Sequence, residues 1–278
     1  MKQTFLSILL ALSLTSCDLL PNLGGDIDNA AGLKEALRIG AATATGILGA
    51  ENGYLLDDAV KILLPTEEQT ALNTLKSIQE FRSSLQSIQI FGETIAGYIP
   101  NLSADFDNIL ITAINRAAEN AASVPQTLNI FKDAITGMSI SDATNILFSG
   151  NNFAARDYLK DNTFIPLQNQ FSPIIDVSLE TVKVGDYTAN SAWALFAEQN
   201  NKLANYLNGN QIVKSLVAAI VPEAANINTV PETLGGYVTG KALDGLFLKI
   251  GDQEAKIRTD VNSRTNKLLQ DVFGQLDK

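Results

Sequence analysis

The chain has 278 residues, of which 46% are hydrophobic and 18% charged, and its formal net charge at pH 7 is −10. This composition predicts a folded protein with a substantial core, and the acidic balance argues against nucleic acid as a partner. Because the chain contains no histidine and a single cysteine, we exclude Ser-His-Asp and Cys-His catalysis and histidine-based zinc sites, and we expect no metal and no cofactor.

Residues 1–16 have the composition of a signal peptide. Lys2 provides a short positive start, and Phe5–Leu14 forms an apolar core. That core is about ten residues long, well short of the roughly 20 apolar residues that a transmembrane helix needs. We therefore expect this segment to direct secretion and to be removed.

The lone cysteine follows the apolar core directly. Leu14–Cys17 resembles the bacterial lipobox, which predicts cleavage between Ser16 and Cys17 and attachment of lipid to Cys17. Two or more acyl chains anchor a protein stably, so the expected location is the cell envelope, with the inner or outer membrane left open. A plain secretory signal or a buried apolar helix are the alternatives. Residues 17–28, rich in turn formers, are expected to be a tether.

From Ile27 onward, apolar residues recur at steps of three and four, which predicts helices along nearly the whole chain. In the first half of the chain we expect a helix over Ile27–Leu48, one opened by Pro65, one capped by Ser103, one starting at Val124-Pro125 and a short one between Ser141 and Gly150. The second half is expected to contain helices over Phe153–Lys160 and Ala189–Tyr206, with Pro166 and Pro173 interrupting the segment between them, and two or three helices between Pro231 and Phe273. Gln211–Val221 is expected to be a buried helix, with a strand as the alternative. We find no alternating strand pattern and no repeat. Residues 29–278 are therefore predicted to form one all-α, bundle-like domain.

One stretch comes close to a nucleotide-binding motif. Gly235–Lys241 matches the first seven positions of the phosphate-binding loop G-x-x-x-x-G-K-[ST], but Ala242 lacks the hydroxyl that would hold magnesium. Residues 228–234 also do not form the apolar strand that should precede such a loop. We interpret the stretch as the start of a helix and expect no nucleotide.

The C-terminal segment combines apolar faces with regularly spaced charges. Glu254 and Arg258 are four residues apart, and Lys241 and Asp244 are three apart, spacings that usually give weak surface ion pairs. With breaks expected at Gly251 and at 260–263, we predict a helical hairpin that closes the bundle and carries these charges, with Arg264, on its solvent side. The competing hypothesis is a polar ligand site, whose candidate residues are Arg116, Lys241, Asp244, Glu254, Arg258 and Arg264.

Four blocks of the sequence resemble one bacterial family. They are Gly32–Ala44, Ile114–Ala122, Phe131–Gly150 and Tyr237–Gly274, in this order. They are similar to domain-of-unknown-function family 4197. The resemblance implies a secreted or lipid-anchored protein of a Gram-negative envelope, which agrees with the lipobox. The family has no assigned activity, so it provides no catalytic residue.

The sequence leaves two functional hypotheses open. The first is a non-catalytic envelope protein, held to the membrane by its lipid, that binds an apolar ligand or another envelope protein. The alternative is a hydrolase that uses carboxylates or a Tyr/Lys pair, because glycosidases need only two carboxylates. A deep cavity with two carboxylates would favour the hydrolase, whereas an apolar cavity or groove would favour binding.

Overall fold

The computed structural model describes residues 27–90, 93–138 and 143–277. The signal peptide, Cys17, most of the predicted tether and Ser141 lie outside these ranges. The described chain is almost entirely helical, which confirms the predicted all-α class. Within the described ranges, no helix is both long enough and apolar enough to cross a bilayer.

Helices of varied length make up most of the described chain. In chain order, the α-helices are α1 (Asn29–Leu48), α2 (Thr66–Glu80), α3 (Arg82–Gln86), α4 (Phe106–Ser123), α5 (Pro125–Gly137), α6 (Ala143–Leu147), α7 (Ala154–Thr181), α8 (Ala189–Gly209), α9 (Gln211–Ile220), α10 (Gly235–Thr259) and α11 (Lys267–Phe273). Short 3-10 helices are η1 (Ile95–Tyr98), η2 (Pro222–Asn226), η3 (Val261–Ser263) and η4 (Gly274–Leu276). Strands β1 (Gln89–Ile90) and β2 (Glu93–Thr94) form one antiparallel hairpin, and β3 (Lys183–Val184) and β4 (Tyr187–Thr188) form another. Pairs of two-residue strands are too short to show an alternating pattern in the sequence.

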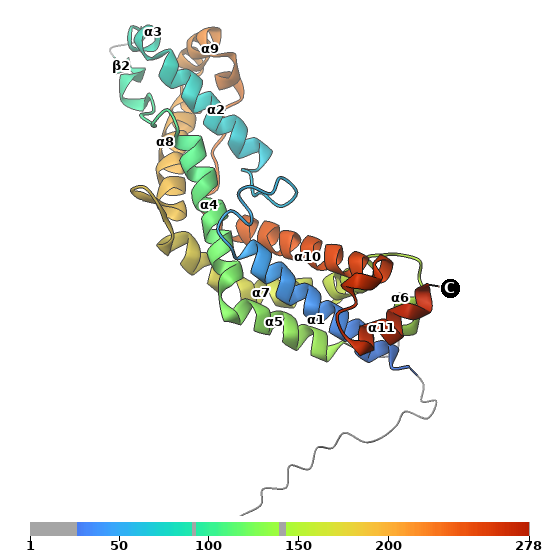
Figure 1. Cartoon of the computed structure of the whole chain (residues 1–278). Helices are drawn as coiled ribbons and strands as arrows, with labels where there is room; N and C mark the ends of the chain where they lie inside the picture. The colour runs from blue at the N-terminus through green and yellow to red at the C-terminus, as the bar shows by residue number, and fades with distance from the viewer. Residues whose placement is uncertain (1–26, 91–92, 139–142, 278) are drawn as a thin grey trace, which may run out of the picture.

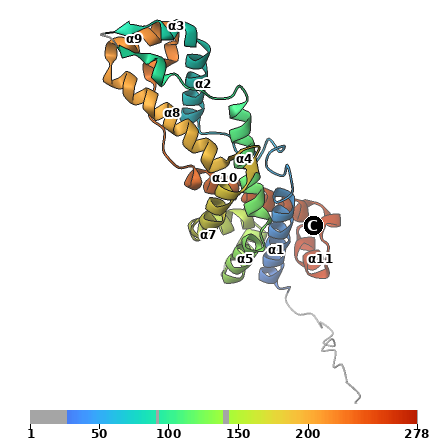
Figure 2. The same cartoon turned by 90° about the vertical axis from the view of Figure 1, so that its left-hand side faces the viewer.

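The helices form a body with an arm (Figure 1). The body contains α1, α5, α6, α7, α10 and α11, and the arm contains α2, α3 and α9. Two long helices, α4 and α8, run between body and arm, and the turned view shows the same elongated shape (Figure 2).

Helix α1 lies at the centre of the body. It packs against α10, α5, α11, α4 and α6, and its predicted stripe from Ala30 to Leu48 is buried. Most of the buried side chains on α1 are small, including Ala36, Ala41 and Ala44, which lets neighbouring helices approach closely. A single continuous core results, and it also contains Phe131 and Phe247, two of its largest side chains.

Most predicted helix starts are confirmed. Helix α5 starts at Pro125 as predicted, whereas α1 starts at Asn29, two residues after the predicted Ile27, with Asp28 as a cap that accepts the N–H of Ala31 at 2.9 Å. Glu67 and Glu68 lie in the first turn of α2, where the helix dipole favours acids. The cap assigned to Ser103 is wrong, because α4 begins at Phe106 and no side chain caps it.

Helix α7 is longer than predicted, because it continues through both prolines. Pro166 and Pro173 lie inside it and are exposed, so water can satisfy the carbonyl groups that lose their helical partners. Its buried stripe, which includes Leu167, Phe171 and Ile175, continues past the prolines and holds the helix against the body. Tertiary packing therefore overrides the two helix breakers.

Two further predictions need correction. The break expected at Gly251 does not occur, since α10 is continuous to Thr259 and only the break at 260–263 is confirmed. A Cβ atom on Gly251 would lie 3.1 Å from Phe153, so this glycine allows the start of α7 to approach α10. The segment after Asn210 is the helix α9, but it is not buried, because Ile212 and Leu216 are exposed.

The contact between α1 and α11 gives a testable prediction. A Cβ atom on Gly32 would lie 2.5 Å from Val272 of α11, so Gly32→Ala should destabilise the protein by about 1–3 kcal/mol through overpacking. Gly46 lies in the same helix with no neighbouring atom within 4 Å, so Gly46→Ala should stabilise it by about 0.5–1 kcal/mol. Urea unfolding measures both, and equal stabilities of the two variants would contradict the docking of α11 on α1.

Candidate functional site

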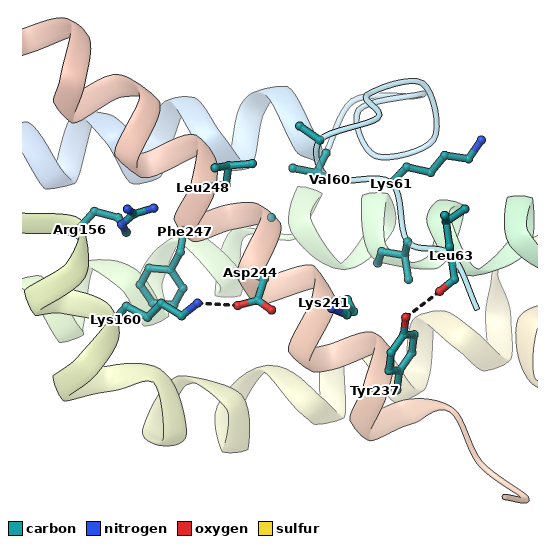
Figure 3. Close-up of a pocket in the computed structure, with 13 residues that line it drawn as sticks. Val60, Lys61, Leu63, Arg156, Lys160, Tyr237, Lys241, Asp244, Phe247 and Leu248 are labelled. Atoms are coloured by element: carbon teal, nitrogen blue, oxygen red, sulfur yellow. Dashed lines mark hydrogen bonds and ion pairs between the residues drawn. The ribbon is translucent and has the colours of Figure 1, made fainter. Parts of the chain in front are cut away.

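A cleft of about 570 Å³ opens between three segments that lie far apart in the sequence. One wall is the segment 59–63, which precedes α2, and the opposite wall is the first part of α7. The floor is the first half of α10 (Figure 3). We call it the basic cleft, and its charged lining residues are Lys61, Arg156, Lys160, Lys241 and Asp244.

Four cations and one carboxylate of the described residues line the basic cleft. Asp244 pairs with Lys160 at 2.7 Å, and Arg156 pairs with Asp157 at 2.6 Å. Among the residues that the structure describes, neither Lys61 nor Lys241 forms an ion pair, although the ammonium of Lys241 lies over the ring of Tyr237. The cleft is thus locally positive in a chain whose net charge is −10.

Helical spacing places these side chains. Tyr237, Lys241, Asp244 and Leu248 follow one another at steps of four, three and four, so they share one face of α10. Arg156 and Lys160 are likewise one turn apart on α7. Figure 3 shows Lys160 and Asp244 meeting in the middle of the cleft, with Tyr237 toward one end and Leu248 toward the other.

Tyr237 closes the end of the cleft near α2. Its hydroxyl donates to the backbone carbonyl of Leu63 at 2.9 Å and ties α10 to the wall formed by 59–63. Partial burial, and to a lesser extent the charge of Glu68, raise the pKa of Tyr237, which keeps this donor protonated. This hydrogen bond forms one end of the cleft.

A buried carboxylate holds the segment that leads into the first wall. Glu119 of α4 accepts the backbone N–H groups of Tyr54 and Leu55 at 3.2 and 3.1 Å, and the guanidinium of Arg116 at 2.6 Å. Asn115, one turn earlier on α4, accepts the N–H of Ile62 at 2.9 Å and donates to the carbonyl of Ile62 at 2.8 Å. Because Ile62 adjoins Lys61, these two side chains of α4 place the wall.

Two contacts with α10 reinforce the same segment. The hydroxyl of Tyr54 donates to the carbonyl of Ala242 at 2.7 Å, and burial raises the pKa of Tyr54 far above its usual range. Lys249 pairs with Asp57 at 2.6 Å, and this hydrogen bond lowers the pKa of Asp57. The segment is therefore fixed to both α4 and α10.

A second buried carboxylate holds the opposite wall. Glu254 of α10 is 1% exposed and accepts the backbone N–H groups of Ala155 and Arg156, in the first turn of α7, at 2.9 and 2.7 Å. These amides have no partner inside their own helix, so Glu254 caps α7 from another helix. It thereby sets the position of Arg156 in the cleft.

Arg258 completes this arrangement. It donates to Glu254 at 2.8 Å, and to the carbonyls of Leu147 and Ile146, at the end of α6, at 2.8 and 3.1 Å. Arg264 in turn donates to the carbonyls of Ile257 and Arg258, at the end of α10, and pairs with Asp277. That hydrogen bond lowers the pKa of Asp277. Both arginines therefore cap helix C-termini.

The six predicted polar residues do not form one site. Lys241 and Asp244 line the basic cleft, but they do not pair with each other, since Asp244 pairs with Lys160. The prediction that Glu254, Arg258 and Arg264 face solvent is wrong, because all three are buried where helix ends need partners. Arg116 belongs to the Glu119 contacts instead.

Sequence reasoning missed Lys61, Arg156, Lys160 and Tyr237 as cleft residues. No local pattern connects them, and only the packing of α7 and of 59–63 on α10 brings them together. The interpretation of Gly235–Lys241 as a helix start is confirmed, because α10 begins at Gly235. Its amides therefore form no phosphate-binding loop, although Lys241 does face the cleft.

The fold and the basic cleft define a helical protein with an open cleft lined mainly by cations. A comparison with known protein families identifies the family of the chain. The family described as "Protein of unknown function (DUF4197)" matches residues 25–91 and 93–274, so the chain belongs to this family. No curated protein and no solved structure matches the chain.

The burial of Arg258 gives a second prediction. Arg258→Ala would leave Glu254 buried without its cation and two carbonyls without donors, so it should cost about 3–5 kcal/mol of unfolding free energy. The matched control is Lys267→Ala, because Lys267 also pairs with an acid at a spacing of four residues, but its side chain is 84% exposed. We expect the free energy of unfolding of this control to equal that of the parent within experimental error. Similar urea midpoints for the two variants would show that Glu254 and Arg258 form an ordinary surface pair.

Proposed function

We propose that this protein is a non-catalytic binding module, held at the bacterial envelope membrane by lipid on Cys17, and that its basic cleft binds an anionic ligand. The observation that carries the proposal is that four cations and a single carboxylate, among the described residues, line the cleft. The rest of the chain is strongly acidic, so this positive site stands out from its surroundings. Attraction between such a cleft and an anion adds both affinity and selectivity.

Lys241 is the group best suited to hold the anion. It lines the cleft, and no carboxylate in the described part of the chain pairs with it, whereas the ammonium of Lys61 points away from Asp244 (Figure 3). An anion would therefore gain new charge-assisted hydrogen bonds without breaking existing ion pairs. Lys160 could contact the ligand only by breaking its ion pair with Asp244.

The cleft does not favour the hydrolase alternative. Acid–base hydrolysis by carboxylates needs two such groups across the substrate, and Asp244 is the single acid that lines the basic cleft. Asp244 is also already engaged in the ion pair with Lys160. Binding explains the observed side chains more simply.

A wholly apolar ligand has less support than an anionic one. The small apolar pocket between Ala30, Leu33 and Met138 has a volume of about 10 Å³, hardly enough for a single water molecule. The basic cleft is far larger and carries polar groups. For this reason we assign the ligand to the cleft.

The anchoring part of the proposal rests on the lipobox at residues 14–17 and on what the family resemblance implies. Cys17→Ser should abolish lipid attachment and leave either an uncleaved precursor or a soluble protein. Metabolic labelling with a palmitate analogue and membrane fractionation of the full chain measure the two effects. A Cys17→Ser protein that is still processed and still fractionates with membranes would refute the anchor.

The binding part is tested with inorganic phosphate and octyl phosphate, and with octyl glucoside as the uncharged control. We expect the anions to bind and the glucoside not to bind, and Lys241→Gln should weaken anion binding about tenfold. Lys132→Gln, which removes the same charge from an exposed site on α5 outside the cleft, should leave the affinity unchanged.

Calorimetry at low and high salt provides the readout, because binding dominated by charge weakens as salt rises. If neither phosphate nor octyl phosphate binds, or if Lys241→Gln and Lys132→Gln behave alike, the cleft is not an anion site.

A further inference from the structure

The basic cleft has an apolar side in addition to its charges. Val60, Ile62, Leu63, Phe247 and Leu248 line it together with the cations. Leu63 is the most accessible of them, with 54% of its surface exposed although it is held by the hydrogen bond from Tyr237 to its carbonyl. Figure 3 shows Leu63 and Leu248 toward opposite ends of the cleft, with Lys241 and Asp244 between them. Apolar side chains therefore lie at the two ends of the cleft and polar ones between them (Figure 3).

The size of the cleft constrains the ligand. Its volume of about 570 Å³ lies within the range of roughly 300–1,000 Å³ that is usual for small-molecule sites. A phosphate or carboxylate group alone would occupy a small part of it and would leave Leu63 and Leu248 in contact with water. A ligand that also carries a hydrocarbon portion would cover Leu63, the more exposed of the two.

We propose that the ligand is an anionic amphiphile, whose acidic head lies at Lys241 and whose hydrocarbon portion covers Leu63. This inference rests on the proposed function, which requires only that the cleft binds an anion. It adds that affinity rises with hydrocarbon length, because buried apolar surface contributes to binding. The same chemistry is offered by free fatty-acid-like molecules and by the headgroup region of an anionic lipid.

Butyl, octyl and dodecyl phosphate, each below its critical micelle concentration, test the hydrocarbon requirement against inorganic phosphate. A methylene that becomes fully buried tightens binding by roughly fourfold. Because the cleft is open, we expect a smaller total gain of at least about tenfold from butyl to octyl phosphate. If inorganic phosphate and all three alkyl phosphates bind equally, the anion site stands and the amphiphile inference fails. If none of them binds, the proposed function fails as well.

A pair of leucine variants locates the hydrocarbon portion. Leu63→Ser should reduce the affinity for dodecyl phosphate by about tenfold and flatten its dependence on chain length. Leu56→Ser is the matched control, because Leu56 belongs to the same segment before α2, is 74% exposed and does not line the cleft. It should bind dodecyl phosphate as the parent does. Since both leucines are exposed, neither change should unfold the protein. Equal effects of the two substitutions, or no effect of Leu63→Ser, would overturn the placement.

A final experiment distinguishes the two sources of amphiphile. The soluble Cys17→Ser protein is sedimented with vesicles of phosphatidylglycerol or of phosphatidylcholine, with and without dodecyl phosphate as competitor. Binding to phosphatidylglycerol vesicles that dodecyl phosphate displaces identifies a lipid in the bilayer. Binding of dodecyl phosphate without vesicle binding identifies a free amphiphile. Vesicle binding that dodecyl phosphate does not displace would place the lipid contact outside the cleft and contradict the inference.

Discussion

Two buried glutamates, Glu119 and Glu254, hold together the segments that the chain brings from far apart. Each accepts two successive backbone N–H groups from a distant segment, and each also pairs with an arginine of its own helix. Burying a carboxylate is costly unless every oxygen is satisfied, and these contacts supply the donors. Because the donors cannot be replaced by water inside the core, each glutamate specifies which segment must pack against it.

The basic cleft is a consequence of these two contacts. Glu254 fixes the first turn of α7 and thus Arg156, while Glu119 and its neighbour Asn115 fix the segment that carries Lys61. Lys241 lies on α10, between the two attached walls. The segments that carry these cations are therefore positioned by interactions made below the surface. Under the proposed function, a cleft built in this way would bind its ligand with little cost in ordering the walls.

The sequence was sufficient for the helices but not for the cleft. Apolar stripes such as that of α1 predict both the helix and its buried face, because burial follows the helical period directly. The spacing of Glu254 and Arg258 is the same for an exposed and a buried pair, and what buries them is α6 and α7 packing over them. The interruptions predicted at Pro166 and Gly251 do not occur for the same reason, because packing against distant segments decides whether a helix continues. Lys61, Arg156 and Lys241 are joined by tertiary structure alone.

Hydrogen exchange of four backbone amides, those of Tyr54, Leu55, Ala155 and Arg156, tests most directly whether the two glutamates hold the walls. Amides in a loop or in the first turn of a helix normally exchange fast, because they lack helical acceptors. If Glu119 and Glu254 accept from them, all four should exchange on the order of a hundredfold or more slowly than the amide of Asp58, an exposed residue of the same loop as Tyr54. Exchange of the four amides as fast as that of Asp58 would contradict a cleft held by buried carboxylates.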